Sequence, residues 1–252
     1  KNLVNEAAMR AAREKRQTVI FEDFDQARDK IIMGSVRTLA IQPDEHHRLA
    51  VHEAGHAIAA HFLENADPLY KVTIIPRGQA LGVTHQLPKY ERHTLSKAYL
   101  CDRLAIMMGG RVAEKRLLDS YSSGADDDIR QATSLARAMV TRWGMSDDIG
   151  PMDLRASDEH PFLGREIAQP KNHSEATAQL VDQAVKALLQ DAERRVGEVI
   201  DKYQDRLLAL ISELEAKETL QQEDLMRILG EPVMAPKLVS AGKQVTAASM
   251  PG

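Results

Sequence analysis

The chain has 252 residues, of which 43% are hydrophobic and 28% charged, and its formal net charge is -4. Because 33 basic residues face 37 acidic ones, the charge gives no support to nucleic-acid binding, which needs a basic surface. The one cysteine can form no internal disulfide, and no apolar run approaches the roughly 18–20 residues of a membrane helix. Aromatic residues are scarce and helix formers plentiful, so we expect a mainly α protein.

Two short helices are expected at the start of the chain. Apolar residues at three- and four-residue spacing predict a helix over 3–12, and a second helix is expected over about 22–33, closed by Gly34. Residues 35–45 have the composition of a linker. Since the chain opens inside a helical pattern without an initiator methionine, we interpret it as a fragment of a longer protein.

A small β unit is expected after a helix over about 46–63. Residues 71–78 alternate apolar and polar side chains and predict a strand, and a return strand is expected at 82–88. Pro76 and Pro88 indicate strands at the edge of a sheet, because proline cannot donate to a ladder of hydrogen bonds.

Helical patterns dominate the remainder of the chain. A helix over 94–118 contains the pair Gly109-Gly110, which indicates close helix packing, and another helix is expected over about 126–143. Residues 145–173, rich in Asp, Pro, Gly and His, are expected to form a long loop.

The longest periodic run covers 174–216, where apolar residues recur every three or four positions. It predicts one long helix, or a hairpin of two, packed on its own domain; a shallow coiled coil is the other interpretation. A short closing helix is expected over 219–229. The last residues, 231–252, have no period and few large apolar side chains, so we expect a disordered tail.

The stretch VHEAGHA at 51–57 carries the strongest chemical signal. His52 and His56 stand four apart, so on a helix both can direct a nitrogen at one metal ion. Two neutral imidazoles favour Zn2+, which would activate a water molecule, and Glu53 would act as general base toward that water. A lone histidine on a core-facing stripe is more often a hydrogen-bonded core residue. Two histidines and a glutamate there are costly unless something satisfies them.

A zinc site needs a third protein ligand. The extended pattern H-E-x-x-H-x-x-G-x-x-H would place histidine where this chain has Phe62, so the ligand must come from elsewhere. In SSGADDDIRQAT, Asp128 lies one turn before the apolar stripe of its helix, whereas Asp127 is on the polar side. Acidic residues at a helix start are explained equally well by capping, so periodicity alone does not decide whether Asp128 is a metal ligand or a capping residue. His85 and His93 are rival ligands.

Several blocks together resemble the FtsH family of membrane-bound, ATP-dependent zinc proteases. The similarity spans roughly residues 3 to 229 in the family's order. The start, LVNEAAMRAARE followed by FEDFDQARDKIIMG, resembles the end of that family's AAA ATPase lid subdomain. The other blocks are HEAGHA (52–57), VTIIPRG (72–78), GVTHQLP (82–88), GGRVAE (109–114), SSGADDDIRQAT (122–133) and VTRWGMSDDIGP (140–151).

The resemblance implies a role for each residue of the site. His52, His56 and Asp128 would bind one Zn2+ ion, and Glu53 would be the general base. Asp127 stands where the family often has Asn and is a minor competitor as ligand.

The resemblance also suggests where substrate binds. An extended substrate could pair with the VTIIPRG strand through its backbone, as sequence-tolerant proteases require. The candidate substrate-binding residues on this expected edge strand are Thr73, Ile74 and Ile75. A purely structural hairpin is the compatible alternative.

The implied architecture is mainly α: a helical zinc-peptidase domain over 46–230 with a small β-hairpin or sheet, preceded by an AAA lid remnant at 1–34 and a linker at 35–45. The implied assembly is a homo-hexamer that degrades unfolded or membrane proteins on the cytoplasmic side of a bacterial inner membrane. The chain has no G-x-x-x-x-G-K-[ST] phosphate loop, so ATP would act only through an ATPase domain absent from it. The membrane would be reached only through missing N-terminal segments.

Two rival interpretations assign no catalysis. A zinc-stabilised assembly module would hold an oligomer together without cleaving anything, but it needs no base such as Glu53, and structural zinc usually has four protein ligands. A metal-free helical adaptor would bind no zinc at all.

Overall fold

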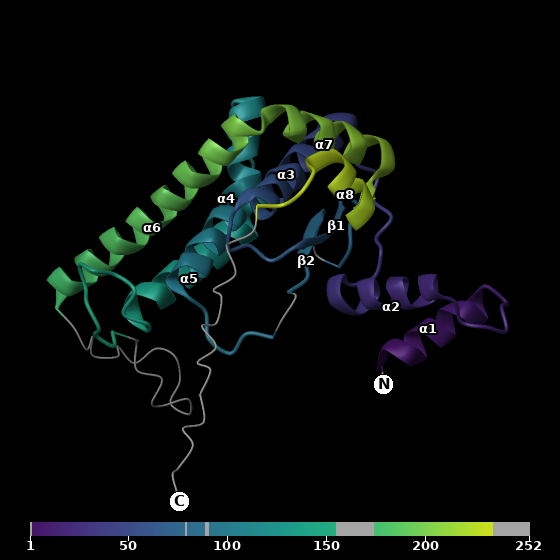
Figure 1. The fold of residues 1–252 in the computed structure, drawn as a ribbon, viewed down its shortest axis with the longest axis horizontal. Coiled ribbons are helices and arrows are strands. Elements are labelled where there is room, and N and C mark those ends of the chain that lie inside the picture. Colours follow the sequence, from purple (N-terminus) through teal and green to yellow (C-terminus); the bar gives the residue numbers. More distant parts are fainter. Residues whose placement is uncertain (1, 79, 89–90, 155–173, 234–252) are drawn as a thin grey trace, which may run out of the picture.

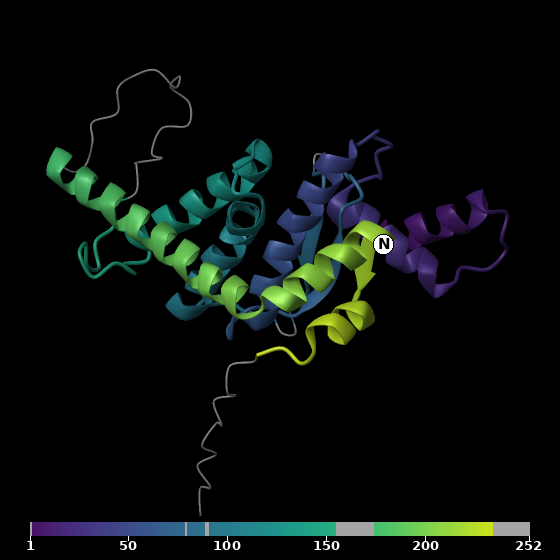
Figure 2. The ribbon, with the colours of Figure 1, turned by 90° about the horizontal axis from the view of Figure 1, so that it is seen from above.

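The computed structural model describes residues 2–78, 80–88, 91–154 and 174–233 (Figure 1). The fold is mainly α with one small antiparallel sheet, as predicted. The helices α1 and α2 lie at one end of the molecule, and α5 with the start of α6 lies at the other (Figures 1 and 2). The elements are α1 (Asn2–Arg13), α2 (Phe21–Met33), α3 (Pro43–Phe62), β1 (Leu69–Thr73), β2 (Val83–Gln86), α4 (Lys97–Leu118), η1 (Ser123–Ala125), α5 (Asp126–Thr141), α6 (Glu175–Lys202), α7 (Gln204–Lys217), β3 (Thr219–Gln221) and α8 (Gln222–Leu229).

The helix α3 forms the centre of the fold. Every residue from Ala50 to Phe62 is buried, because α4, α6, α7 and the sheet all contact it. Pro43 in its first turn and the acids that follow favour a helix start there, so the helix begins three residues earlier than predicted, inside the expected linker. Its many alanines are good helix formers and also let neighbouring helices approach closely.

Glycines allow α3 and α4 to touch through their backbones, as the pair Gly109-Gly110 predicted. A Cβ atom on Gly55 would lie 2.3 Å from the carbonyl oxygen of Gly109, and one on Gly109 would lie 2.5 Å from that of Gly55. Neither glycine has a positive φ, so backbone conformation does not require glycine at these positions. The close approach of the two helices does require it. A Cβ on Gly110 would meet the ring of His52 at 2.5 Å, which brings α4 directly against the HEAGH segment.

The sheet has the order β2-β1-β3, with both pairs antiparallel. Two predictions are wrong here. The strand predicted over 71–78 starts at Leu69 and ends at Thr73, and it is the central strand because both β2 and β3 pair with it. The closing helix predicted over 219–229 gives its first three residues to β3. A three-residue strand has no periodic signal, and its pairing depends on contacts far along the chain.

The run 174–216 forms two helices, α6 and α7, joined at Tyr203. They follow one bent path in Figure 1 and have few contacts with each other, so the alternative of a hairpin is wrong. Tyr203 leaves helical geometry and stacks on Phe62 of α3, with ring centroids 3.6 Å apart. The bend lets both helices cover α3.

A buried ion cluster connects α2 to the sheet. The Nζ atom of Lys71, on β1, lies 2.7 Å from Asp29 and 3.0 Å from Asp25, both on α2. The Lys71 side chain is only 4% exposed, so it has left water for these two carboxylates.

Two predicted segments are described only in part. The loop expected over 145–173 contains no helix or strand as far as residue 154, and the tail expected over 231–252 is described only to residue 233; the remainder of both lies outside the described residues. In the described part of the chain, no helix has the length and apolar character to cross a membrane.

Candidate metal centre

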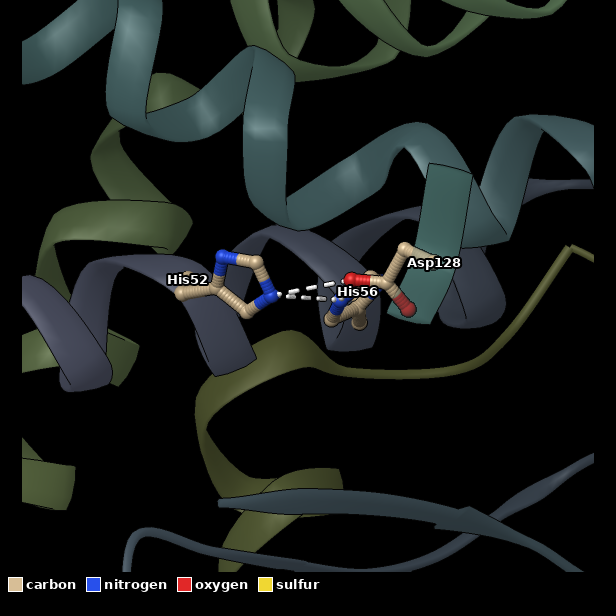
Figure 3. A group of neighbouring side chains, drawn as sticks. All are labelled: His52, His56 and Asp128. Atoms are coloured by element: carbon tan, nitrogen blue, oxygen red, sulfur yellow. Dashed lines mark hydrogen bonds and ion pairs between the residues drawn. The ribbon is translucent and has the colours of Figure 1, made fainter. Parts of the chain in front are cut away.

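Three ligand atoms converge where α3 passes the first turn of α5. The Nε2 atoms of His52 and His56 lie 3.1 Å apart, and a carboxylate oxygen of Asp128 lies 3.1 and 3.2 Å from them (Figure 3). The four-residue spacing on α3 places both rings on one face of the helix. The 3-10 turn η1 leads into α5, so Asp128 stands in its first turn and points inward.

The other ring nitrogens are committed to hydrogen bonds. His56 Nδ1 donates to the carbonyl oxygen of Ile106, and His52 Nδ1 donates to Oε1 of Glu114, each over 2.7 Å. A carbonyl oxygen and a carboxylate can only accept, so each neutral imidazole presents the lone pair of Nε2 to the other and to Asp128. Three acceptors facing one point require a cation between them. The set of two imidazoles and one carboxylate fits Zn2+ in a site that keeps a fourth position open.

The pKa shifts of His52 and Asp128 also indicate that a cation is favoured at this site. Burial disfavours a charged His52, but its hydrogen bonds with Asp128 and Glu114 outweigh that effect and raise the pKa of His52 to about 10. Burial also works against the carboxylate of Asp128, yet its contacts with His52 and His56 hold its pKa far below the usual range. Both shifts mean that this point of the structure favours positive charge: a proton on His52 Nε2 would supply that charge when no metal ion is bound, and a metal ion held by both Nε2 lone pairs would replace that proton.

Glu53 lies beside the three ligands but outside their group. Its Oε2 atom accepts a hydrogen bond from Thr84 Oγ1 over 2.8 Å. Burial, the largest effect, raises the pKa of Glu53. Glu53 and the three ligands line one cleft of about 660 Å³, whose other walls come from β2, α4 and the turn before α5.

The rival ligands do not join this group. Asp127 has a side chain that is 63% exposed and binds Arg130 and Gln131 on the surface. His85 faces the ring of Tyr70, and His93 is exposed. Among the described residues, only the set His52, His56 and Asp128 brings three ligand atoms of this kind together.

Sequence reasoning missed Glu114, which orients His52. Its side chain is 1% exposed, and its second oxygen accepts from Arg48 over 2.8 Å. The spacing of residues along two helices could have indicated Glu114. Glu114 follows Gly110 by four residues and Arg48 precedes His52 by four, so the two members of each pair lie on the same face of their helix.

The predicted edge position of the strand that carries Thr73, Ile74 and Ile75 is wrong, which removes the reason for expecting substrate there. Thr73 and Ile74 are only 1% and 2% exposed, β1 is paired on both sides, and Ile74 and Ile75 lie beyond its end. The backbone N–H of Ile74 donates instead to the carbonyl oxygen of Glu218. In the described part of the chain, β2 is the edge strand next to the cleft, which Thr84 lines.

Comparisons with known proteins agree with the class of site. A helical domain with an H-E-x-x-H pair and a distant carboxylate has the ligand set of a metallopeptidase. The model of Peptidase family M41 matches residues 39–228, and the chain belongs to that family. It is 59% identical over 225 residues to the ATP-dependent zinc metalloprotease FtsH of Hahella chejuensis, covering 89% of this chain and 36% of that protein.

A second relative gives the same result. The ATP-dependent zinc metalloprotease FtsH 4 of Sphaerobacter thermophilus is 49% identical over 231 residues, which cover 92% of this chain and 35% of that protein. The chain thus spans about a third of the length of the curated relatives that it matches.

Proposed function

We propose that the chain is the zinc-dependent endopeptidase module of an ATP-dependent processive protease, which hydrolyses peptide bonds of unfolded protein chains. The observation that carries this proposal is the convergence of His52, His56 and Asp128 at the wall of a cleft, with Glu53 beside them. Bound Zn2+ supplies polarisation of the scissile carbonyl and lowers the pKa of a water molecule to about 7.

The protein's own groups carry out the proton transfers. Glu53 takes a proton from the attacking water and then passes it to the leaving amine. Its burial raises its pKa above that of an ordinary carboxyl, which brings its proton affinity closer to what both transfers need. Glu114 and the Ile106 carbonyl hold the two imidazoles in the orientation and tautomer that ligands require.

Substrate binds in extended form along β2. An edge strand offers unpaired backbone groups, and pairing through the backbone tolerates many side-chain sequences. Because Thr84 lies on this strand and contacts Glu53, a paired substrate would run past the base. This assignment replaces the earlier candidate residues on β1.

The module works within a larger assembly. The relatives are named as ATP-dependent zinc metalloproteases and are much longer, which supports an ATPase domain outside this chain as the source of ATP use. We assign residues 1–34 to the lid of that ATPase domain, residues 35–45 to a linker and residues 46–230 to the peptidase domain; helix α3 begins at Pro43, within the linker. The assembly is a homo-hexamer on the cytoplasmic side of a bacterial inner membrane, degrading unfolded or membrane proteins.

The alternative is a zinc-stabilised assembly module without peptidase activity. Two observations favour the peptidase: the ligand group opens on a cleft, and beside it stands the buried carboxylate of Glu53, which pairs with no Lys or Arg among the described residues. A structural site needs neither feature.

The decisive experiment compares cleavage of a fluorogenic unfolded polypeptide by the zinc-loaded protein and by Glu53→Gln, with zinc content measured in both. We expect Glu53→Gln to keep zinc and lose cleavage, while Asp128→Asn loses zinc. Asp127→Asn is the matched control, a neighbouring acid on the surface, and should change neither. If the parent and Glu53→Gln both hold zinc and neither cleaves, the assembly module is the better description.

A further inference from the structure

The carboxylate of Glu53 is held by one short segment, Gly82–Thr84, at the start of β2. Thr84 Oγ1 lies 2.8 Å from Glu53 Oε2 and 3.1 Å from the Glu53 carbonyl oxygen. A hydroxyl has a single proton, and the carbonyl lies within α3, where it already accepts from the helix. The shorter contact, to the charged carboxylate, is therefore the one that the hydroxyl makes.

Gly82 forms the second part of this support. A Cβ atom there would lie 2.5 Å from Glu53 Oε1, 2.7 Å from Cγ and 2.8 Å from Cδ. Gly82 does not have a positive φ, so the residue is not required by its backbone conformation. It is required because the backbone of the residue just before β2 lies directly against the carboxylate, where no side chain fits.

We infer that Thr84 is a positioning residue for the reaction: it fixes the carboxylate of Glu53 through one hydrogen bond to Oε2, while the absence of a side chain at Gly82 leaves room for Oε1. This inference rests on the proposed function, in which Glu53 is the general base. Thr84 is paired with Val72 of the central strand, so the support belongs to a sheet and not to a free loop. Groups on paired strands hold a catalytic side chain more accurately than groups on loops.

Because Thr84 lies on β2, one strand would both pair with substrate and orient the general base. The edge that would pair with an extended substrate and the hydroxyl that orients the base both belong to β2. Fixing β2 by substrate pairing would thus fix the base as well. The placement of Glu53 should therefore affect turnover, and substrate affinity much less.

The test uses Thr84→Val, which removes the hydroxyl at nearly constant volume, and Thr84→Ser, which keeps it. In the zinc-loaded protein, Thr84→Val should lower kcat roughly 10- to 100-fold, the effect of losing one hydrogen bond to a charged group, with KM and zinc content unchanged. Thr84→Ser should recover most of kcat. Thr141→Val, which removes a buried hydroxyl bonded to a helix carbonyl on α5, is the matched control and should leave kcat unchanged. An unchanged kcat in Thr84→Val, or a Thr84→Ser that is equally impaired, overturns the inference.

A structural readout separates this inference from the proposed function. Crystal structures of the zinc-loaded variants should show the Glu53 carboxylate displaced in Thr84→Val and in Gly82→Ala, but retained in Thr84→Ser. If the parent cleaves nothing, the proposed function fails, yet the same structures still decide whether Thr84 holds Glu53. A carboxylate that stays in place in both Thr84→Val and Gly82→Ala refutes the positioning role.

Discussion

Glu114→Ala should weaken zinc binding without touching a ligand. The Glu114 carboxylate is 1% exposed, accepts from His52 Nδ1 over 2.7 Å and pairs with Arg48 over 2.8 Å. Groups that orient a ligating histidine typically contribute 10- to 100-fold to metal affinity, which is about 1.4–2.7 kcal/mol. The variant also leaves the buried Nδ1–H of His52 without an acceptor, so the free energy of unfolding should fall by about 1–3 kcal/mol.

Zinc affinity is measured by competition against a chromogenic chelator, and stability by urea denaturation of the same samples. Asp119→Ala is the control, because Asp119 is an exposed carboxylate at the end of the same helix and pairs with Lys115. Its zinc affinity should equal that of the parent. If Glu114→Ala binds zinc within twofold of the parent, the hydrogen bond to His52 does not orient the ligand and the reasoning fails.

Two further predictions concern the scaffold that carries the site. Gly55→Ala should cost about 1–3 kcal/mol or more in urea denaturation, since its Cβ would lie 2.3 Å from a backbone oxygen of α4; Gly197→Ala, whose Cβ would meet the flexible end of an arginine at 3.1 Å, should cost less. Equal losses in both would argue against the close approach of α3 and α4. Lys71→Met should cost about 3 kcal/mol, the low end for breaking a buried ion pair, because Arg28 still contacts both carboxylates and Arg77 contacts Asp29. Limited proteolysis should then release α1 and α2 first. Resistance equal to that of the parent would show that the ion cluster does not hold α2 to the sheet.

Local spacing explains what was predictable. The relative positions of His52, Glu53 and His56 were predictable because spacing along one helix determines where side chains lie in space. Asp128 was open on periodicity alone, and the structure directs it to the ligand group because η1 turns the chain just before α5. The pair Gly109-Gly110 correctly indicated close packing, since helical glycines need a reason that outweighs their cost.

Long-range pairing explains what was not predictable. β1 is central because Thr73 pairs with Thr219, almost 150 residues later, and no local pattern carries that information. Prolines near the end of the predicted strand suggested an edge, but Pro76 lies beyond the real end of β1 and says nothing about its neighbours. The error placed the expected substrate contact on β1, whereas the edge strand next to the cleft is β2.

The site itself also depends on both local spacing and long-range contacts. α3 supplies His52, Glu53 and His56 by local spacing, yet the groups that orient them, and the third ligand, lie between 31 and 76 residues away along the chain. A motif can therefore identify the class of chemistry, because it names the atoms that meet the metal. The positions of the reacting groups depend on the packing of β2, α4 and α5 against α3. Variants of these supporting contacts should therefore change zinc affinity and kcat independently of each other.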